Sequence, residues 1–338
     1  MSELLDSLPL NQLQASVAKE QTGYFIFSLD TEMAWGYFDT FNPKMFSKDG
    51  YRERQTIERL LDIFDEFNIT VTWAIVGHMF CKNYETCGSE QIFKWEGKYP
   101  TFEKLYYDSH PLLYSADVIE TLLKRGSRHE IGFHGYTHKI FKEDKMSEEQ
   151  ARTEILEWLR KTKPFNIIPR SVAFPRNKIG YLKLFKENGF ICYRGEELYP
   201  GNHYYLPLIG KVFRRFYDYF CIFSNPVIYE FQVDRSGLIK IPSSRDLFGF
   251  NRNVERLLYV VNLHNLSMMP LVRGIQKAAS QKKIFHLFAH PHEFIYEKDF
   301  KKLRYLLEHV ANEINKGRIQ SISMGDLAKK VLEAKLGG

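Results

Sequence analysis

Short apolar runs alternate with longer segments of helical spacing along most of this chain. The first run, at 24–29, is nearly continuous, as in a strand that is covered on both faces. The segment at 52–67 then carries apolar residues at helical spacing, and a second apolar run follows it. The same rhythm predicts strands at 24–29, 70–76, 130–133, 171–174, 190–193, 238–241, 284–289 and 319–323. It predicts the main helices near 52–67, 116–124, 147–161, 252–281, 299–316 and 324–334.

This alternation predicts a parallel α/β architecture. With seven or eight strands, the pattern favours a barrel over an open sheet, and no glycine-rich fingerprint of a dinucleotide-binding fold follows the first strand. Ser147 stands three residues before Gln150, which predicts a capping box at the start of a helix. In a parallel barrel, chemistry lies where the strands end and the loops begin, so candidate site residues are sought there.

Three stretches interrupt the rhythm. Residues 1–21 are polar and weakly helical, and we interpret them as an N-terminal extension. Residues 78–114 and 196–236 are irregular and rich in aromatic side chains, and we predict them to be long loop insertions. A length of 338 residues could hold two domains, but we expect a single catalytic domain over 22–338 that contains both insertions.

Composition and charge exclude several classes of protein. Hydrophobic residues make up 44% and charged residues 26% of the chain, which is ordinary for a globular protein and excludes disorder and coiled coils. No apolar run approaches the ~18 residues of a membrane span, so no transmembrane segment is expected. The net charge of +6 is scattered, which mildly favours anionic partners but is no signature of nucleic-acid binding.

Cysteine usage and the start of the chain bear on the compartment. The four cysteines are Cys81, Cys87, Cys192 and Cys221, and a chain of this size does not need disulfides for stability. We therefore expect four reduced thiols, since an isolated C-x5-C pair is a poor zinc signature. The first residues lack a basic segment followed by an apolar one, so a cytoplasmic location is expected.

Polar residues gather at the predicted ends of three strands. Asp30 and Glu32 follow the first strand and, if it continues through them, point to the same side. His134 and His138 follow the third strand at a spacing of four residues, which suits a two-histidine metal site. His290 ends the strand at 284–289, where a histidine can act as a general acid.

Each of these residues also has an ordinary structural explanation. The two acids could cap a helix, and the histidines could be polar loop residues. Arg176 and Arg194 also follow predicted strands, and either could orient a carboxylate or a substrate, although solvated arginines are common. Inside the strand at 284–289, His286 is better explained as a hydrogen-bonded core residue. The joint position of these residues at strand ends is what favours a site.

The motifs together resemble those of the polysaccharide deacetylase family, the NodB-homology domain of carbohydrate esterase family four. The strongest match is H-E-I-G-F-H-G-Y-T-H at 129–138, and the order of the acidic, histidine, Pro/Arg and late His-Pro motifs agrees with it from about 24 to 329. The resemblance implies a distorted (β/α)7 barrel with long loop insertions. It also implies one divalent metal ion, with Zn²⁺ as first choice and Co²⁺, Ni²⁺, Mn²⁺ or Fe²⁺ compatible with the same ligands.

The resemblance also implies roles for individual residues. Asp30 would be the general base, His290 the general acid, and Glu32, His134 and His138 the metal ligands. Two departures stand out. The family's first motif has two adjacent Asp residues where this chain has Asp30-Thr31-Glu32, and its third motif has Arg where this chain has Ala173. Arg176 is therefore our candidate for the residue that orients Asp30.

These expectations lead to one function and two alternatives. The function is metal-dependent removal of an acetyl group, N-acetyl first, from a sugar of a polysaccharide or of its nucleotide- or lipid-linked precursor. The first alternative is an allantoinase-like hydrolase of a cyclic or linear amide. The second is a non-catalytic carbohydrate-binding protein, motivated by the altered motifs. The oligomeric state stays open.

Overall fold

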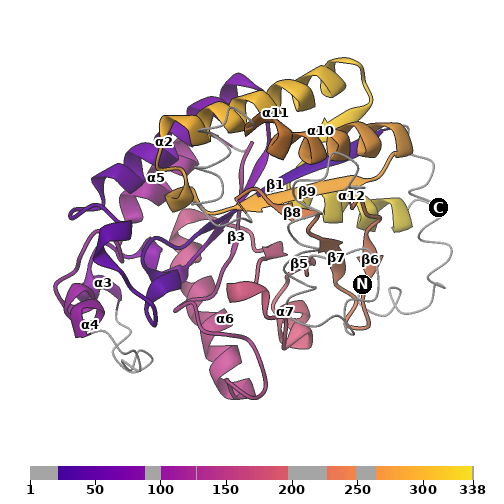
Figure 1. The fold of residues 1–338 in the computed structure, drawn as a ribbon. Helices are drawn as coiled ribbons and strands as arrows, with labels where there is room; N and C mark the ends of the chain where they lie inside the picture. Colours follow the sequence, from indigo (N-terminus) through magenta and orange to yellow (C-terminus); the bar gives the residue numbers. More distant parts are fainter. Residues whose placement is uncertain (1–21, 88–99, 127, 197–226, 249–263, 337–338) are drawn as a thin grey trace, which may run out of the picture.

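A computed structural model describes residues 22–87, 100–126, 128–196, 227–248 and 264–336. Its core is one curled sheet (Figure 1). The strand order is β6-β7-β5-β4-β3-β2-β1-β9-β8, and β10 pairs with the start of β1. The seven main strands are all parallel: β1 (Gly23–Thr31), β2 (Val71–Ile75), β3 (Glu130–Phe133), β4 (Ser171–Val172), β5 (Cys192–Gly195), β7 (Ile239–Pro242) and β9 (Ile284–Ala289). The predicted distorted (β/α)7 barrel is confirmed.

Helices cover the outside of this sheet. In Figure 1, some of these helices run along the upper side of the sheet and others lie below it. Those on the upper side are α2 (Tyr51–Glu66), α5 (Ala116–Lys124), α10 (His264–Gln281) and α11 (Glu297–Asn315), and those below are α6 (Glu148–Thr162) and α7 (Leu182–Glu187). The last helix, α12 (Met324–Leu336), follows β10 (Ile319–Ser321).

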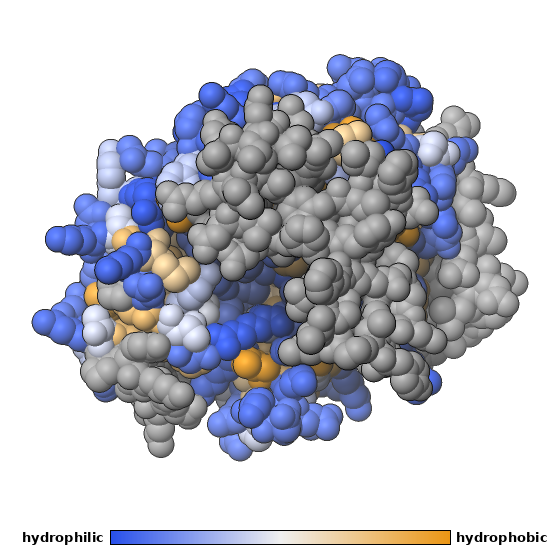
Figure 2. Space-filling view, viewed as in Figure 1, coloured by the Kyte–Doolittle hydropathy of each residue, from blue (hydrophilic) through white to orange (hydrophobic). Residues whose placement is uncertain are grey.

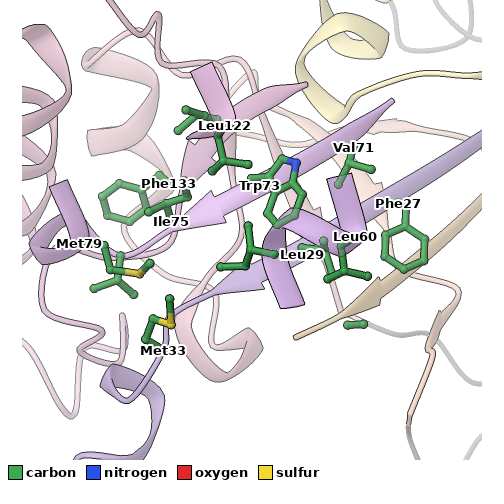
Figure 3. Close-up of a cluster of buried hydrophobic side chains, with 14 of the residues drawn as sticks. Phe27, Leu29, Met33, Leu60, Val71, Trp73, Ile75, Met79, Leu122 and Phe133 are labelled. Atoms are coloured by element: carbon green, nitrogen blue, oxygen red, sulfur yellow. The ribbon is translucent and has the colours of Figure 1, made fainter. Parts of the chain in front are cut away.

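The alternation of side chains along β1 divides the core into two clusters. Phe27 and Leu29 point to the outer face and meet α2 and α5. Figure 3 shows this outer cluster, to which β2 and the two helices contribute Val71, Trp73, Ile75, Leu60 and Leu122. Tyr24 and Ile26 belong to a second cluster with buried residues of α12. Burying such side chains contributes about 1.5–3 kcal/mol each.

The inner face of β1 changes from apolar to polar along the strand. After Tyr24 and Ile26 come Ser28 and Asp30 on the same face, and Glu32 lies just beyond the last strand residue. All three polar residues are buried. The apolar end is therefore packed, while the carboxyl end of the barrel contains ionisable groups.

The short link between β7 and β8 (Arg245–Asp246) closes the curled sheet. Ser243 donates its backbone N–H to Gly195 of β5, at 3.3 Å, and Ser244 donates to His286 of β9, at 2.7 Å. This link thus joins two strands that stand far apart in the sheet order. The edge beyond β7 is the antiparallel strand β6 (Gln232–Val233).

Most predicted boundaries agree with the structure to within a few residues. The predicted loop at 78–114 is wrong in part, because it contains α3 (Tyr84–Cys87) and α4 (Pro100–Tyr107). The predicted extension at 1–21, residues 197–226 of the second insertion and the first part of the predicted helix at 252–281 lie outside the described residues.

The expectation of reduced thiols needs a correction at two positions. Cys81 and Cys87 form a disulfide, with their Cα atoms 5.2 Å apart. The pair can form because a short 3-10 turn and α3 fold the six-residue separation back on itself, which C-x5-C spacing alone does not reveal. Cys192 is free and buried, and Cys221 lies outside the described residues.

The described part of the face drawn in Figure 2 is mostly polar. In Figure 2, hydrophilic residues dominate the visible described surface, and hydrophobic residues show only as small separate patches. Among the described helices, none is both long enough and apolar enough to cross a membrane.

The predicted capping box is present at the start of α6, where Gln150 donates its backbone N–H to the Ser147 hydroxyl and accepts from the Ser147 N–H. Because Ser147→Ala removes one of these bonds, we expect the free energy of unfolding to fall by about 0.5–2 kcal/mol in urea titrations. Thr153→Ala, on the exposed face of the same helix, is the control and should change it by less than about 0.5 kcal/mol. Equal effects of the two substitutions would show that the cap contributes nothing specific.

Candidate metal centre and active site

Glu32 lies at the carboxyl end of β1, in a tight turn. Its carbonyl accepts a hydrogen bond from the N–H of Trp35 at 2.9 Å, and Met33 between them has φ 48°. The side chain then folds over Gly36, where an added Cβ would lie 2.0 Å from Glu32 Oε1. A larger residue at position 36 would therefore have to displace this carboxylate.

His134 and His138 bring their imidazoles to the same carboxylate. His134 directs Nδ1 at the carbonyl of Ala173, 2.8 Å away, which leaves Nε2 facing Glu32 Oε2 at 3.1 Å. His138 Nε2 lies 2.8 Å from the same oxygen. The three predicted metal ligands thus converge on one point.

The loop between these histidines is held by a buried acid. Glu154 of α6 accepts from the backbone N–H groups of Tyr136 and Thr137, at 2.8 and 2.9 Å, and from the Thr137 hydroxyl. This support matters because His138 itself has φ 60°, an unfavourable conformation that a residue other than glycine keeps only when its surroundings impose it.

The donor set fits a divalent metal ion. One oxygen of Glu32 and one nitrogen each of His134 and His138 lie within 4.8 Å of one another, and all three residues are buried. Neither ring nitrogen of His138 has a hydrogen-bond partner of good geometry, although both are buried. Two imidazoles and one carboxylate leave coordination positions for water and substrate, as a catalytic site requires.

Electrostatics favours the forms that bind metal. Burial would raise the pKa of Glu32, but His138 and His134 outweigh it and hold that pKa well below its usual value. Burial lowers the pKa of His138, against the opposing effect of Glu32. The lowered pKa values favour the carboxylate form of Glu32 and the neutral form of His138, which are the forms that bind metal.

Arg194 of β5 holds Asp30 with two hydrogen bonds of 2.6 Å each. The same guanidinium donates to Ser28 and Asn177, at 3.2 and 2.9 Å, and packs over the Phe288 ring. Burial would raise the pKa of Asp30, but Arg194 and the two nearby histidines lower it to about 2. Asp30 is therefore a fixed, ionised carboxylate.

The expected contact between Arg176 and Asp30 is wrong. Arg176 instead pairs with Asp39 and donates to the carbonyl of Gly36 at 3.3 Å. Its backbone turns away after Pro175 into a left-handed conformation, with φ 53°. The residue that orients Asp30 is Arg194.

His290, at the end of β9, also approaches both acids. Its Nε2 lies 3.8 Å from Asp30 Oδ2 and 4.0 Å from Glu32 Oε1, and its Nδ1 lies 3.0 Å from Glu293. Burial would lower the pKa of His290, but Glu293, Glu32 and Asp30 raise it well above its usual value. These carboxylates therefore favour the protonated form of His290, which is the form that can donate a proton.

The two neighbouring histidines have other surroundings. His286 is fully buried and lies 2.9 Å from the Ser28 hydroxyl through Nε2, which confirms the prediction of a hydrogen-bonded core histidine. His292 lies in the turn after β9, with Nε2 2.9 Å from the Tyr37 hydroxyl.

Comparison with protein families agrees with this geometry. Residues 45–176 match the family model described as polysaccharide deacetylase, which confirms the predicted resemblance. The matched segment contains His134 and His138 but ends before Arg194 and His290. A search of curated proteins found no match.

Solved structures share the fold at low sequence identity. A proposed polysaccharide deacetylase from Mycobacterium smegmatis is 15% identical with a TM-score of 0.55, covering 94% of this chain and 93% of its own. A second, from Pseudomonas aeruginosa, is 15% identical with a TM-score of 0.50, covering 96% and 94%. The PuuE allantoinase is 16% identical with a TM-score of 0.51, covering 90% and 89%. These likenesses establish the fold.

Three residues of the site were not assigned from the sequence. Arg194 was one of two arginines left open, and alternation along β5 could have favoured it, because a strand residue two positions from buried Cys192 faces the same side. Glu293 follows His290 at three residues, a spacing that allows contact within a turn. Glu154 gives no local signal, since its contact with 136–137 exists only in the folded chain.

The two arginines allow a direct test of which one supports Asp30. Arg194→Met leaves a buried carboxylate unpaired, so the free energy of unfolding should fall by about 3–5 kcal/mol at neutral pH. Arg176→Met, which breaks a half-exposed pair, should cost no more than about 1 kcal/mol. Chemical unfolding of both variants provides the measurement.

The loss in Arg194→Met should also depend on pH. Without the guanidinium, burial raises the folded-state pKa of Asp30 above its unfolded value, so the penalty is full at neutral pH and shrinks as pH falls through the raised pKa. A loss that is independent of pH, or equal in the two variants, would contradict the assignment of Arg194.

Proposed function

We propose that this protein is a metal-dependent deacetylase that removes an acetyl group from a sugar. The observation that carries the proposal is the convergence of Asp30, Glu32, His134, His138 and His290 in one buried cluster at the carboxyl end of the barrel. The match of residues 45–176 to the polysaccharide deacetylase family model supports the same class of activity.

Each of these residues has a separate proposed role in the hydrolysis of an acetamide. Water is a poor nucleophile and an amine is a poor leaving group, so the reaction needs both an activated water and a proton donor. A divalent ion held by Glu32, His134 and His138 would activate the water and polarise the acyl oxygen. The preferred ion is Zn²⁺, although imidazole and carboxylate ligands also suit other transition metals.

Asp30 is the proposed general base. It is ionised, its Oδ2 lies 4.0 Å from His134 Nε2, and Arg194 holds both of its oxygens in place. Because its pKa is low, Asp30 has little intrinsic affinity for a proton. Its proposed contribution is that Arg194 holds this proton acceptor in a fixed position next to the metal ligands. Arg194 acts through Asp30 and is a positioning residue.

His290 is the proposed general acid. Its Nε2 faces Asp30 and Glu32, while Glu293 accepts at Nδ1 and stabilises the protonated ring. Its side chain is also the most exposed of this cluster, at 25%, against 5% for Asp30 and 6% for Glu32. A departing sugar amine can therefore reach this proton donor.

An acetylated sugar in a polysaccharide or in a nucleotide- or lipid-linked precursor is the proposed substrate class. The net charge of +6 favours the phosphate-bearing precursors, which a cytoplasmic enzyme would meet. The fold alone does not separate this function from an allantoinase-like activity, since the allantoinase match has a TM-score of 0.51. Arg194 holds Asp30 where the altered third motif lacks its arginine, so only the altered first motif, Asp30-Thr31-Glu32, still motivates the non-catalytic alternative.

A substrate screen tests the proposal. Acetylated amino sugars, chitin-type oligomers and nucleotide-linked sugars are compared with allantoin and other cyclic amides, with release of acetate as the first signal. We expect acetate from at least one sugar, and its loss after metal chelation. Turnover of cyclic amides without acetate release would favour the allantoinase-like function, and no turnover by metal-loaded protein would favour a binding role.

Glu32→Gln and Asp30→Asn form a matched pair of carboxylate-to-amide changes. Glu32→Gln should lower the bound metal from about one ion per chain to a small fraction, because a neutral amide is a weak ligand for such ions. Asp30→Asn should keep the metal and lose turnover, because Asp30 is proposed to accept a proton rather than bind the ion. Elemental analysis of the folded variants gives the answer, and the reverse pattern would exchange the two roles.

The proton donor predicts a pH dependence. Because the acid must be protonated, activity falls as pH rises through the pKa of His290, and His290→Ala should remove this alkaline limb and lower kcat roughly 10²–10⁴-fold. Glu293→Gln removes a charge that raises that pKa, so the alkaline limb should move to lower pH. His292→Ala is the control and should keep the limb. If His292→Ala loses the limb and His290→Ala keeps it, the acid is His292.

A further inference from the structure

A second cluster of side chains that could bind a metal ion consists of His78, Cys81 and Cys87. His78 belongs to a 3-10 turn (Gly77–Phe80), Cys81 follows that turn, and Cys87 is the last residue of α3. All three are buried, and their nitrogen and sulfur atoms lie within 4.8 Å of one another. His78 Nδ1 faces Cys87 Sγ at 2.9 Å.

We propose that His78, Cys81 and Cys87 form a second metal site, for a thiophilic ion such as Zn²⁺, when the Cys81–Cys87 disulfide is reduced. The disulfide of the structure is then the oxidised, metal-free form. A phosphine or thiol reductant supplies two electrons and, with two protons, yields two thiols. Binding of the ion replaces the two thiol protons, which are released.

The chemistry of the donors selects the kind of ion. Thiolate and imidazole ligands suit Zn²⁺ and disfavour Mg²⁺ and Ca²⁺, which prefer oxygen. Two thiolates also neutralise a divalent cation, so the loaded site buries no net charge of its own. Three protein ligands leave one position of a tetrahedral ion for water. The Tyr136 hydroxyl also lies 3.4 Å from Cys87 Sγ.

The surrounding backbone holds the three donors in place. The N–H of Cys81 donates to the carbonyl of His78 at 3.0 Å, and that of Cys87 donates to Asn83 at 3.2 Å. Lys161 of α6 donates to the carbonyl of Cys87 and so fixes the end of α3. The donors therefore keep their places by contacts that do not involve the S–S bond.

The cluster also touches both segments that build the first site. The His78 ring stacks between Trp35 and Tyr136, with centroid distances of 4.4 and 4.3 Å. Trp35 lies three residues after Glu32, and Tyr136 lies between the two metal histidines. The N–H of His78 also donates to the carbonyl of Tyr136 at 3.2 Å. The second cluster therefore packs directly against both segments that carry ligands of the first site.

Cobalt titration of the whole, metal-free chain tests this proposal in two redox states. Reduced protein should bind about two Co²⁺ per chain and show the near-ultraviolet charge-transfer absorption of thiolate–Co²⁺ bonds, whereas oxidised protein should bind about one without it. This comparison needs no substitution, so it is decisive even where a variant does not fold. A reduced protein that binds one ion and lacks the absorption would overturn the proposal.

Variants locate the ions. Reduced Cys87→Ser should lose the absorption and one bound ion, and the matched control Cys192→Ser, which changes another buried cysteine, should keep both. His138→Ala should lose the other ion and keep the absorption, which separates this proposal from the proposed deacetylase activity. Absorption that persists in Cys87→Ser, or disappears in His138→Ala, would contradict an independent second site.

Discussion

The alternation of side chains along β1 links the stability of this protein to its chemistry. Phe27 and Leu29 pack against helices on one face, and Ser28 and Asp30 point into the barrel on the other. A shift of one residue in the register of β1 would bury the charges in the outer core and turn the phenylalanines into the site. The outer core therefore determines where Asp30 and Glu32 lie.

Charge balance is the second constraint on the site. Two buried carboxylates, Asp30 and Glu32, both approach His134 Nε2, at 4.0 and 3.1 Å, and each has its own further partners. Arg194 neutralises Asp30, while His134 and His138 lie against Glu32 and the proposed ion would balance its charge. This separation keeps one carboxylate available as a base and the other as a ligand, although neighbouring carboxylates would otherwise raise each other's pKa.

The sequence predicted much of the fold and five members of the cluster, and the misses have physical reasons. Period-two and helical patterns are local, so strands and helices could be recognised from them, and the position of Asp30, Glu32, His134, His138 and His290 after strands predicted that they meet. The prediction that Arg176 orients Asp30 was wrong, and Arg194 does so instead. Which arginine reaches Asp30 depends on the direction of side chains along β5 and on the turn after Pro175, neither of which the local sequence reveals. The Cys81–Cys87 contact depends on two short helical turns inside a segment that was predicted to be a loop.

The central claim is that Glu32, His134 and His138 hold one catalytic metal ion. Anomalous X-ray diffraction at the zinc edge, on crystals of the zinc-loaded oxidised protein, tests it directly. The account predicts one strong anomalous peak within bonding distance of Glu32 Oε2, His134 Nε2 and His138 Nε2. Crystals of active protein with no peak among these three residues would contradict it.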